Sequence, residues 1–269
     1  MIEAQRRPAD RAAPAFALDS LTFSVPGRIL LHPTTLDLPA GRMIGLLGPN
    51  GSGKSTLLKL LARQMRPTSG TIAHAGRPLA SYAERDFART VAYLPQDLPT
   101  AAGLRVRDLV ALGRYPWHGA LGRFGADDHA MVAHALERTA LIGLAERAVA
   151  TLSGGERQRV WMAMLVAQDA RVLLLDEPIS ALDVAHQVEI LALVRSLAVE
   201  KNLTVVVVLH DVNLAVRFCD EIVALKGGRV AARADAEAFL DAATLRSIYD
   251  VEMDVFAHPR TGRPLAAVV

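Results

Sequence analysis

The chain has 269 residues, of which 51% are hydrophobic and 22% are charged. This composition is typical of a globular protein with one large core, or of a core with a subdomain. Its 30 Lys and Arg residues are scattered among 28 Asp and Glu residues. Because they form no block and the formal net charge is only +2, the charge pattern gives no support to a nucleic-acid partner.

The amino-terminal segment, residues 1–15, predicts a loose tail. It carries Arg and Pro where a secretory signal needs an apolar stretch. The longest strongly apolar runs, such as residues 204–209, are far shorter than the roughly 20 residues that cross a bilayer. We therefore expect a protein that is soluble, or that reaches a membrane through a partner.

The next segment predicts a small β subdomain followed by a strand, a loop and a helix. Residues 16–38 form short alternating runs that Pro26-Gly27 and Pro33 interrupt, a pattern typical of antiparallel strands and turns. An apolar run at 43–47 then meets a glycine-rich loop. Residues 54–65 follow it with leucines at helical spacing.

Two later apolar runs, 172–175 and 205–209, are short and bounded by charged residues, and 184–199 between them has a helical pattern. Strands that alternate with helices predict a parallel sheet covered by helices. The fold class is therefore α/β.

The residue patterns in the middle and at the end of the chain differ from those of this core. Residues 106–112, stopped by Gly113, and 127–144, started by Asp127 or a neighbour, predict an inserted helical subdomain. From residue 235 onward we expect two short helices, with Asp241 as the N-cap of the second, and no further domain.

These patterns together predict one domain over residues 16–269. Its core with the β subdomain covers 16–96 and 166–235, the helical subdomain covers 97–165, and a carboxy-terminal extension covers 236–269.

Residues 48–55 form a complete G-x-x-x-x-G-K-S motif between the predicted strand and helix, the context in which this motif binds nucleotide phosphates. Its backbone N–H groups and the helix N-terminus attract phosphate, Lys54 reaches the terminal phosphates, and the Ser55 hydroxyl meets Mg²⁺. The alternative is a glycine-rich turn without a ligand. We predict ATP and Mg²⁺ as ligands, with ATP bound by Gly48, Pro49, Asn50, Gly51, Ser52, Gly53, Lys54, Ser55 and Thr56.

Two adjacent carboxylates, Asp176 and Glu177, end the buried strand at 172–175, at the kind of sheet edge where open α/β sheets bind ligands. Asp176 would hold Mg²⁺ and Glu177 would activate the attacking water as general base. Adjacent acids at a strand end are often only a solvated edge or a helix cap, but the phosphate loop upstream favours the functional role.

The segment Leu-Ser-Gly-Gly-Glu at 152–156 opens a helix and is a second anion-binding N-terminus, although Ser153 and Glu156 also fit a capping box. Here the chain resembles the ABC ATPases, whose signature sequence this segment matches. Two anion sites in one chain indicate that two chains sandwich two nucleotides. The residues expected to face the partner chain's nucleotide are Ser153, Gly154, Gly155, Glu156 and Asp183.

Other elements of that family follow in the same order. The resemblance implies that Gln96 senses Mg²⁺ and the membrane partner, that Asp183 in Ser-Ala-Leu-Asp lines the dimer seam, and that His210 contacts the γ-phosphate. A lone His at a strand end is more often structural, and only its place in the series favours catalysis by His210 with Glu177 and Lys54. Two positions depart from the family: Val25 stands where an aromatic residue often stacks on adenine, and Ile179 where Thr is usual.

Residues 25–33 and 113–125 resemble the ATPases of iron-chelate importers, above all those of ferric hydroxamate importers, and the likeness covers 16–258. It implies a homodimer on a polytopic permease, at the cytoplasmic face of the bacterial inner membrane, served indirectly by a periplasmic binding protein. Catecholate siderophores, haem and cobalamin stay open as cargo. The segment 113–125 is expected to face the permease, or else to be an exposed loop with a packed tryptophan.

Two rival functions use the same motifs. ATPases of DNA repair or chromosome organisation usually insert coiled coils or zinc modules between the phosphate loop and the signature, and the segment between Lys54 and Ser153 is too short for them. Ribosome-associated ABC proteins generally carry two tandem ATPase units, whereas this chain has one.

Overall fold

The computed structural model describes residues 13–119, 122–180 and 182–269. Its central sheet has six strands in the order β10-β9-β3-β8-β7-β6, all parallel except the edge strand β10. Every residue of the three middle strands β3, β8 and β7 is buried, as expected for a sheet covered on both faces. The strand bounds are β3 (Met43–Leu47), β6 (Val91–Leu94), β7 (Val172–Leu175), β8 (Thr204–Val208), β9 (Glu221–Lys226) and β10 (Arg229–Asp235).

The predicted parallel sheet is confirmed, with one small correction. The strand expected at 205–209 is Thr204–Val208, because Thr204 already pairs with Val172 of β7 and Val208 is the last residue that pairs with β3.

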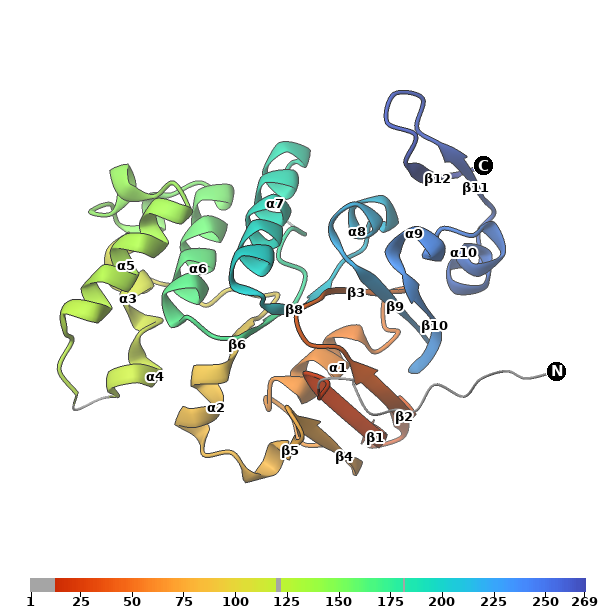
Figure 1. Ribbon diagram of the computed structural model, residues 1–269, viewed down its shortest axis with the longest axis horizontal. Coiled ribbons are helices and arrows are strands. Elements are labelled where there is room, and N and C mark those ends of the chain that lie inside the picture. The colour runs from red at the N-terminus through yellow and green to blue at the C-terminus, as the bar shows by residue number, and fades with distance from the viewer. Residues whose placement is uncertain (1–12, 120–121, 181) are drawn as a thin grey trace, which may run out of the picture.

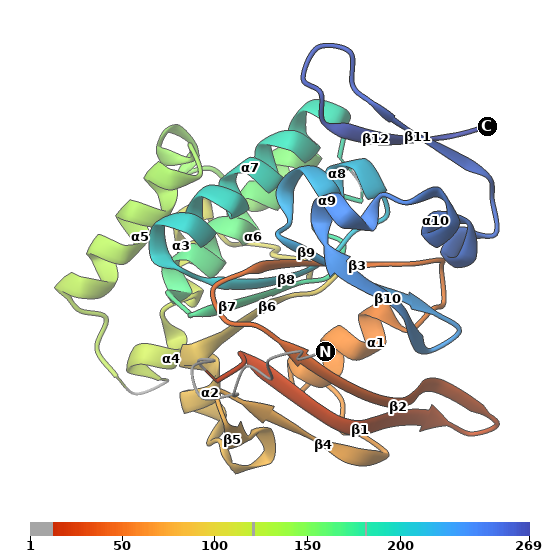
Figure 2. The ribbon, with the colours of Figure 1, turned by 45° about the vertical axis from the view of Figure 1, so that its right-hand side comes forward.

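Helices cover the two faces of this sheet, and Figure 2 shows the layers. On one face lies α1 (Lys54–Leu61), packed between the sheet and the β subdomain. On the other lie α6 (Gly154–Gln168), α7 (Val184–Lys201) and α8 (Val212–Phe218). The helix expected over 54–65 ends at Leu61, since Arg63 adopts a left-handed φ of 56° and its amide bonds to the Leu60 carbonyl, three residues back.

The antiparallel β subdomain is also confirmed. Its strands are β1 (Phe16–Val25), β2 (Arg28–Leu38), β4 (Ser69–His74) and β5 (Arg77–Pro78), in the order β2-β1-β4-β5. The Pro26-Gly27 turn joins β1 to β2, and Gly27 supplies the left-handed φ of 77° that this turn needs. The 3₁₀ turn η1 (Leu79–Ser81) and α2 (Glu84–Thr90) lead from this sheet back to β6.

A helical segment, at the left of Figure 1, consists of α3 (Val106–Leu112), α4 (Tyr115–His118), α5 (Ala126–Arg138) and α6, with 3₁₀ turns η2 (Ile142–Leu144) and η3 (Val149–Thr151). The helix expected over 127–144 is wrong at both ends. It starts after Gly125, whose amide donates to the Asp128 carboxylate, and it stops at Arg138, before η2.

The carboxy-terminal part holds α9 (Ala236–Phe239) and α10 (Ala242–Tyr249). The Asp241 N-cap is confirmed, because its Oδ2 accepts a 2.8 Å hydrogen bond from the Thr244 amide. A hairpin of β11 (Met253–Ala257) and β12 (Pro264–Val268), at the upper right of Figure 1, was not predicted. The expected tail lies outside the described residues over 1–12, and the division at 97, 166 and 236 stays a prediction.

Candidate active site

The phosphate loop lies between β3 and α1, and its shape depends on glycine. Gly48 has φ 133°, and a Cβ there would lie 2.0 Å from the Leu225 carbonyl oxygen. Gly53, the N-cap of α1, has φ 104°, and its Cβ would lie 2.9 Å from the Leu30 carbonyl oxygen. Side chains at either position would therefore deform the loop that presents the first N–H groups of α1.

Lys54 is buried at the centre of this loop. Its Nζ donates hydrogen bonds to the carbonyl oxygens of Gly48 and Pro49, at 2.8 and 2.9 Å. Burial lowers the pKa of the ammonium group, and the negative charges of Glu177 and Asp176 oppose that shift. The cation is thus held in place by two loop carbonyls and balanced by two carboxylates.

A hydroxyl and a carboxylate meet beside the loop. The Ser55 Oγ donates a 2.8 Å hydrogen bond to Asp176 Oδ1, and Asp176 is fully buried. Its other oxygen, Oδ2, is buried and has no hydrogen-bond partner among the described residues. Burial raises the pKa of Asp176, and burial together with the charge of Asp176 raises that of Tyr93 to about 12.

This donor set fits Mg²⁺. The ion prefers oxygen ligands and is usually held by one or two carboxylates together with substrate phosphates. The unpartnered Asp176 oxygen and the Ser55 hydroxyl are such ligands. Within residues 13–119, 122–180 and 182–269 there is no cluster of three His, Cys, Asp or Glu side chains that could hold a metal ion.

Three polar side chains converge at the carboxyl edge of the sheet. Gln96 follows β6, Glu177 follows β7 and His210 follows β8, and these strands are neighbours. Gln96 Nε2 donates a 2.8 Å hydrogen bond to Glu177 Oε2, and His210 Nε2 lies 2.8 Å from Glu177 Oε1. Glu177 has a left-handed backbone with φ 51°, a strained conformation that tends to occur at functional sites.

A pocket of about 550 Å³ contains these groups. It is lined by loop residues 50–56, by Gln96, Glu177 and His210, and by Arg28 and Leu30 of β2. The structure therefore brings most of the predicted ATP and catalytic residues together, while Gly48 and Pro49 contribute through their bonds to Lys54. Asp176 lies buried behind the pocket wall.

Two residues of this pocket, Arg28 and Leu30, are not predicted from the sequence, where Val25 stands at the position of an aromatic residue that often stacks on adenine. Val25 pairs with Arg28 across the β1–β2 ladder, is 40% exposed and does not line the pocket. The sequence signal for this contact is Arg28 itself, a basic residue directly after the Pro26-Gly27 turn.

The signature residues form a second, separate group. Ser153 is the N-cap of α6: its Oγ accepts from the Glu156 amide at 3.2 Å, and Glu156 Oε2 accepts from the Ser153 amide at 2.8 Å. The predicted capping box is therefore confirmed. Neither this group, residues 153–156, nor Asp183 lines the phosphate-loop pocket.

Asp183 caps α7 and connects to the signature helix through His186. Its Oδ1 accepts from the His186 amide at 3.0 Å and lies 2.8 Å from the His186 Nδ1. The same imidazole packs against Gly155, where a Cβ would lie 2.9 Å from the ring. Ala181, within the predicted Ser-Ala-Leu-Asp motif, lies outside the described residues, as do Ala120 and Leu121 in the segment 113–125.

In the described part of the chain no helix is both long and apolar enough to cross a bilayer.

Residues 31–180 match the family model described as ABC transporter. The iron(3+)-hydroxamate import ATP-binding protein of Bacillus subtilis (strain 168) is 37% identical, over 93% of this chain and 93% of its own length. The hemin import ATP-binding protein of Pseudomonas putida is 43% identical, over 88% and 92%.

Solved structures agree with these relatives. The chain resembles one from a metal-chelate type ABC transporter in an inward-facing conformation, with a TM-score of 0.82, 28% identity, and coverage of 95% of this chain and 96% of that one. It also resembles an ATP-binding cassette in a dimeric post-hydrolysis state bound to ADP and Pi, with a TM-score of 0.71, 27% identity, and coverage of 82% and 98%. The chain therefore has the α/β P-loop NTPase fold and belongs to the ABC transporter family, as an ATPase that is coupled to transport.

Proposed function

We propose that this chain is the ATP-hydrolysing subunit of an importer of ferric hydroxamate siderophores, which it powers by ATP-driven closure of a homodimer. The observation that carries the ATPase part is the meeting of Gln96, Glu177 and His210 beside the phosphate loop. These groups surround the place where the terminal phosphate of a bound nucleotide would lie.

Hydrolysis needs a positioned nucleophile and stabilised charge on the phosphoryl group. The α1 N-terminus and Lys54 hold the phosphates, and Glu177 orients a water molecule and takes its proton as it attacks in line. His210 and Gln96 fix the Glu177 carboxylate from two sides. Ser55 and Asp176 would hold Mg²⁺, which would neutralise charge on the phosphate oxygens.

The dimer is supported by the position of the signature. Ser153 and its neighbours form a helix N-terminus of the kind that binds anions, and it does not line the chain's own pocket, which supports its supply to a nucleotide by a second copy. One structural relative is described as a dimer. Closure driven by ATP follows if ATP binds the closed pair more tightly than the open pair.

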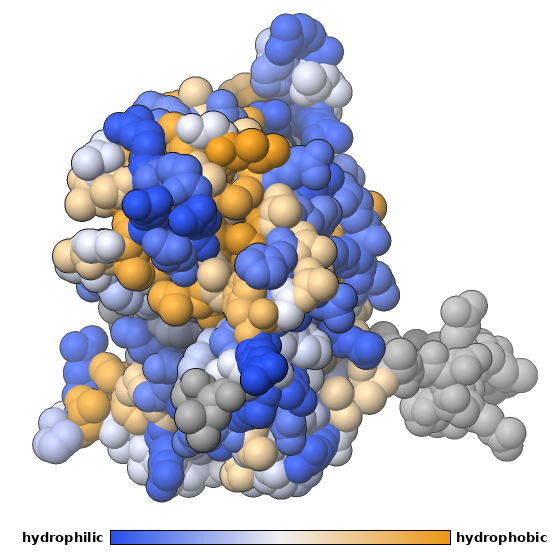
Figure 3. Space-filling view, turned by 90° about the vertical axis from the view of Figure 1, so that its left-hand side faces the viewer, coloured by the Kyte–Doolittle hydropathy of each residue, from blue (hydrophilic) through white to orange (hydrophobic). Residues whose placement is uncertain are grey.

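A permease partner is supported by the surface of the helical segment. Figure 3 shows apolar residues gathered on the face that this segment presents. Such a patch is typical of a contact with another protein. We propose that the permease covers this face and thereby places the chain at the cytoplasmic side of the bacterial inner membrane, with a periplasmic binding protein as an indirect partner. The exposed large hydrophobic residues of the segment are Leu112, Tyr115, Trp117 and Ile142.

The cargo rests on the relatives. One is described as importing iron(3+)-hydroxamate and another as importing hemin. Hydroxamate agrees with the likeness seen in residues 25–33 and 113–125, and haem, cobalamin or another iron chelate is the alternative.

The experiment is uptake of radioactive iron from ferrichrome in cells whose one copy of this gene carries Lys54→Ala, with Lys201→Ala as a control outside the site. Loss of ferrichrome uptake in the first strain, with cobalamin uptake intact, supports both motor and cargo. Unchanged ferrichrome uptake would refute the cargo assignment, while ATP hydrolysis by the purified chain tests the motor separately.

A further inference from the structure

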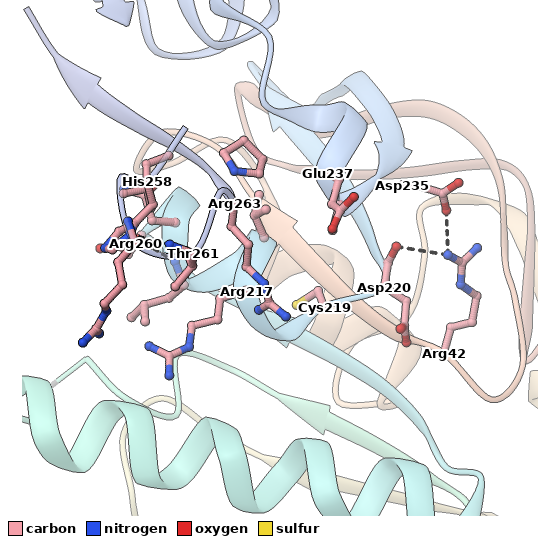
Figure 4. A pocket seen from close by; sticks show the side chains of 17 residues that line it. Arg42, Arg217, Cys219, Asp220, Asp235, Glu237, His258, Arg260, Thr261 and Arg263 are labelled. Atoms are coloured by element: carbon pink, nitrogen blue, oxygen red, sulfur yellow. Dashed lines mark hydrogen bonds and ion pairs between the residues drawn. The ribbon is translucent and has the colours of Figure 1, made fainter. Parts of the chain in front are cut away.

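A second cavity, of about 740 Å³, lies away from the nucleotide pocket (Figure 4). Its walls are α8, the end of β10 with the start of α9, and the loop at 258–263 that joins β11 to β12. Asp211, which lines it, directly follows His210 of the nucleotide pocket. The cavity therefore adjoins the helix that carries this histidine at its start.

Three exposed guanidinium groups line this cavity. Arg217 comes from α8, and Arg260 and Arg263 come from the loop between β11 and β12. Across the described residues, none of the three side chains forms an ion pair or a hydrogen bond; Arg217 lies over the Phe218 ring at 5.1 Å. Three like charges on two separate elements are thus left without counter-ions.

The acids of the same cavity are mostly engaged elsewhere. Asp235 pairs with Arg42 at 2.6 Å, and Asp220 accepts two 2.7 Å hydrogen bonds from an arginine of α7. Asp211 caps α8 through a 2.8 Å hydrogen bond from the Leu214 amide. Glu237 faces the cavity without an ion pair in the described part of the chain. Among the described residues, three arginines without ion pairs therefore face two carboxylates without ion pairs, Asp211 and Glu237, of which Asp211 is engaged as a helix cap.

The loop that carries two of the arginines is held by its own hydrogen bonds. His258 Nδ1 accepts from the backbone amides of Arg260 and Thr261, at 3.1 and 3.3 Å, and the His258 amide donates to the Arg263 carbonyl oxygen at 2.8 Å. The hairpin is also attached to α8, because the Asn213 side-chain amide exchanges hydrogen bonds of 2.9 and 2.8 Å with the backbone of Ala266. The two sources of positive charge are therefore held beside each other.

We propose that this cavity binds a small polyanion, which bridges Arg217 of α8 to Arg260 and Arg263 of the hairpin loop. Guanidinium groups recognise phosphate and carboxylate oxygens through paired hydrogen bonds, and these two groups are the chemical class of ligand. A bound polyanion removes the repulsion among the three arginines. It also joins the carboxy-terminal extension to the helix that follows His210.

The test is a calorimetric titration of the full chain, saturated with MgADP so that the phosphate loop is filled. The probes are inorganic pyrophosphate and tricarballylate, one for each anionic group. The variants are Arg217→Ala/Arg263→Ala, its counterpart Arg217→Lys/Arg263→Lys, and a control, Arg246→Ala. Arg246 is an exposed α10 residue that pairs with Glu252 and does not line the cavity.

We expect saturable binding of at least one probe, weakened about a hundredfold by the double alanine variant, since it removes two charge-assisted contacts and each is worth about a factor of ten. The double lysine variant keeps the charge and retains part of the affinity, and Arg246→Ala binds as the wild type does. The tighter probe tells a phosphate ligand from a carboxylate ligand. Absence of saturable binding, or unchanged affinity in the double alanine variant, overturns the proposal, and neither result bears on ATP hydrolysis or cargo.

Discussion

Replacement of Glu177 by Gln isolates the charge of one side chain. Glutamine has the same length, so it keeps the contact with Gln96 Nε2 and the neighbouring position of His210, both at 2.8 Å. The substitution removes the carboxylate that acts as the proposed general base and accepts a proton from water. Removing a general base typically slows a reaction by about 10² to 10⁴, which corresponds to roughly 3–5 kcal/mol of activation free energy.

Lys54 and the glycine-rich loop are untouched by this change, so nucleotide binding should persist. Three measurements check it: phosphate release from ATP, titration with a fluorescent ATP analogue, and size-exclusion chromatography with MgATP. We expect very slow hydrolysis, near-normal binding and an accumulated dimer. The control is Glu189→Gln, because that exposed carboxylate makes a surface ion pair with Arg159, an interaction worth little. Wild-type turnover in Glu177→Gln would remove Glu177 from its proposed role, and loss of ATP binding would make its role structural.

Two further predictions concern the loop and the helical segment. Gly48→Ala should abolish ATP binding, because its Cβ would lie 2.0 Å from a backbone carbonyl of β9. Gly51→Ala, with φ 74° and open space, should lose only about tenfold through roughly 1–2 kcal/mol of left-handed strain, and nucleotide titration of both variants separates the two effects. Asp128→Asn should cost about 2 kcal/mol of unfolding free energy at pH 7, since hydrogen bonds from the Gly125 amide and from Arg114 hold the pKa of Asp128 below its ordinary value. A lowered folded-state pKa stabilises the protein above the unfolded value of about 3.9 and ceases to do so as the pH falls through the folded value, so urea unfolding curves of variant and wild type should converge in acid and stay apart at neutral pH.

The parts of the fold that could be predicted are those with a strong local signal. The buried strands β3 and β7 are continuous apolar runs bounded by glycine or charge, and both were placed to the residue. The capping box of α6 is predicted from the sequence because Ser153 and Glu156 bond to each other within one turn, although the helix expected over 156–167 spans Gly154–Gln168. In each case the residues that fix the structure are neighbours in the sequence.

The parts that escaped prediction depend on contacts between distant segments. The β11–β12 hairpin is partly polar and packs on α8 through Asn213, which lies 53 positions before Ala266. Arg28 enters the nucleotide pocket only because β2 lies against the phosphate loop, where the Leu30 carbonyl approaches Gly53. The end of α5 at Arg138 has no glycine or proline beside it as a sequence signal. The backbone turns instead at Ala140, which has φ 55°.

The geometry of the proposed catalytic site is predicted from the sequence only in part. The sequence predicts a parallel sheet, and parallel strands present their carboxyl ends at one edge, so residues that follow such strands are expected at one edge as well. It does not predict that β6, β7 and β8 are neighbours, and this order is what places Gln96 and His210 on the two sides of Glu177. The signature group lies apart from these side chains: the same topology that assembles one half of the proposed site leaves Ser153 outside the pocket. We propose that a second copy completes the site, and the rate of hydrolysis per chain should then rise with protein concentration until the dimer is saturated.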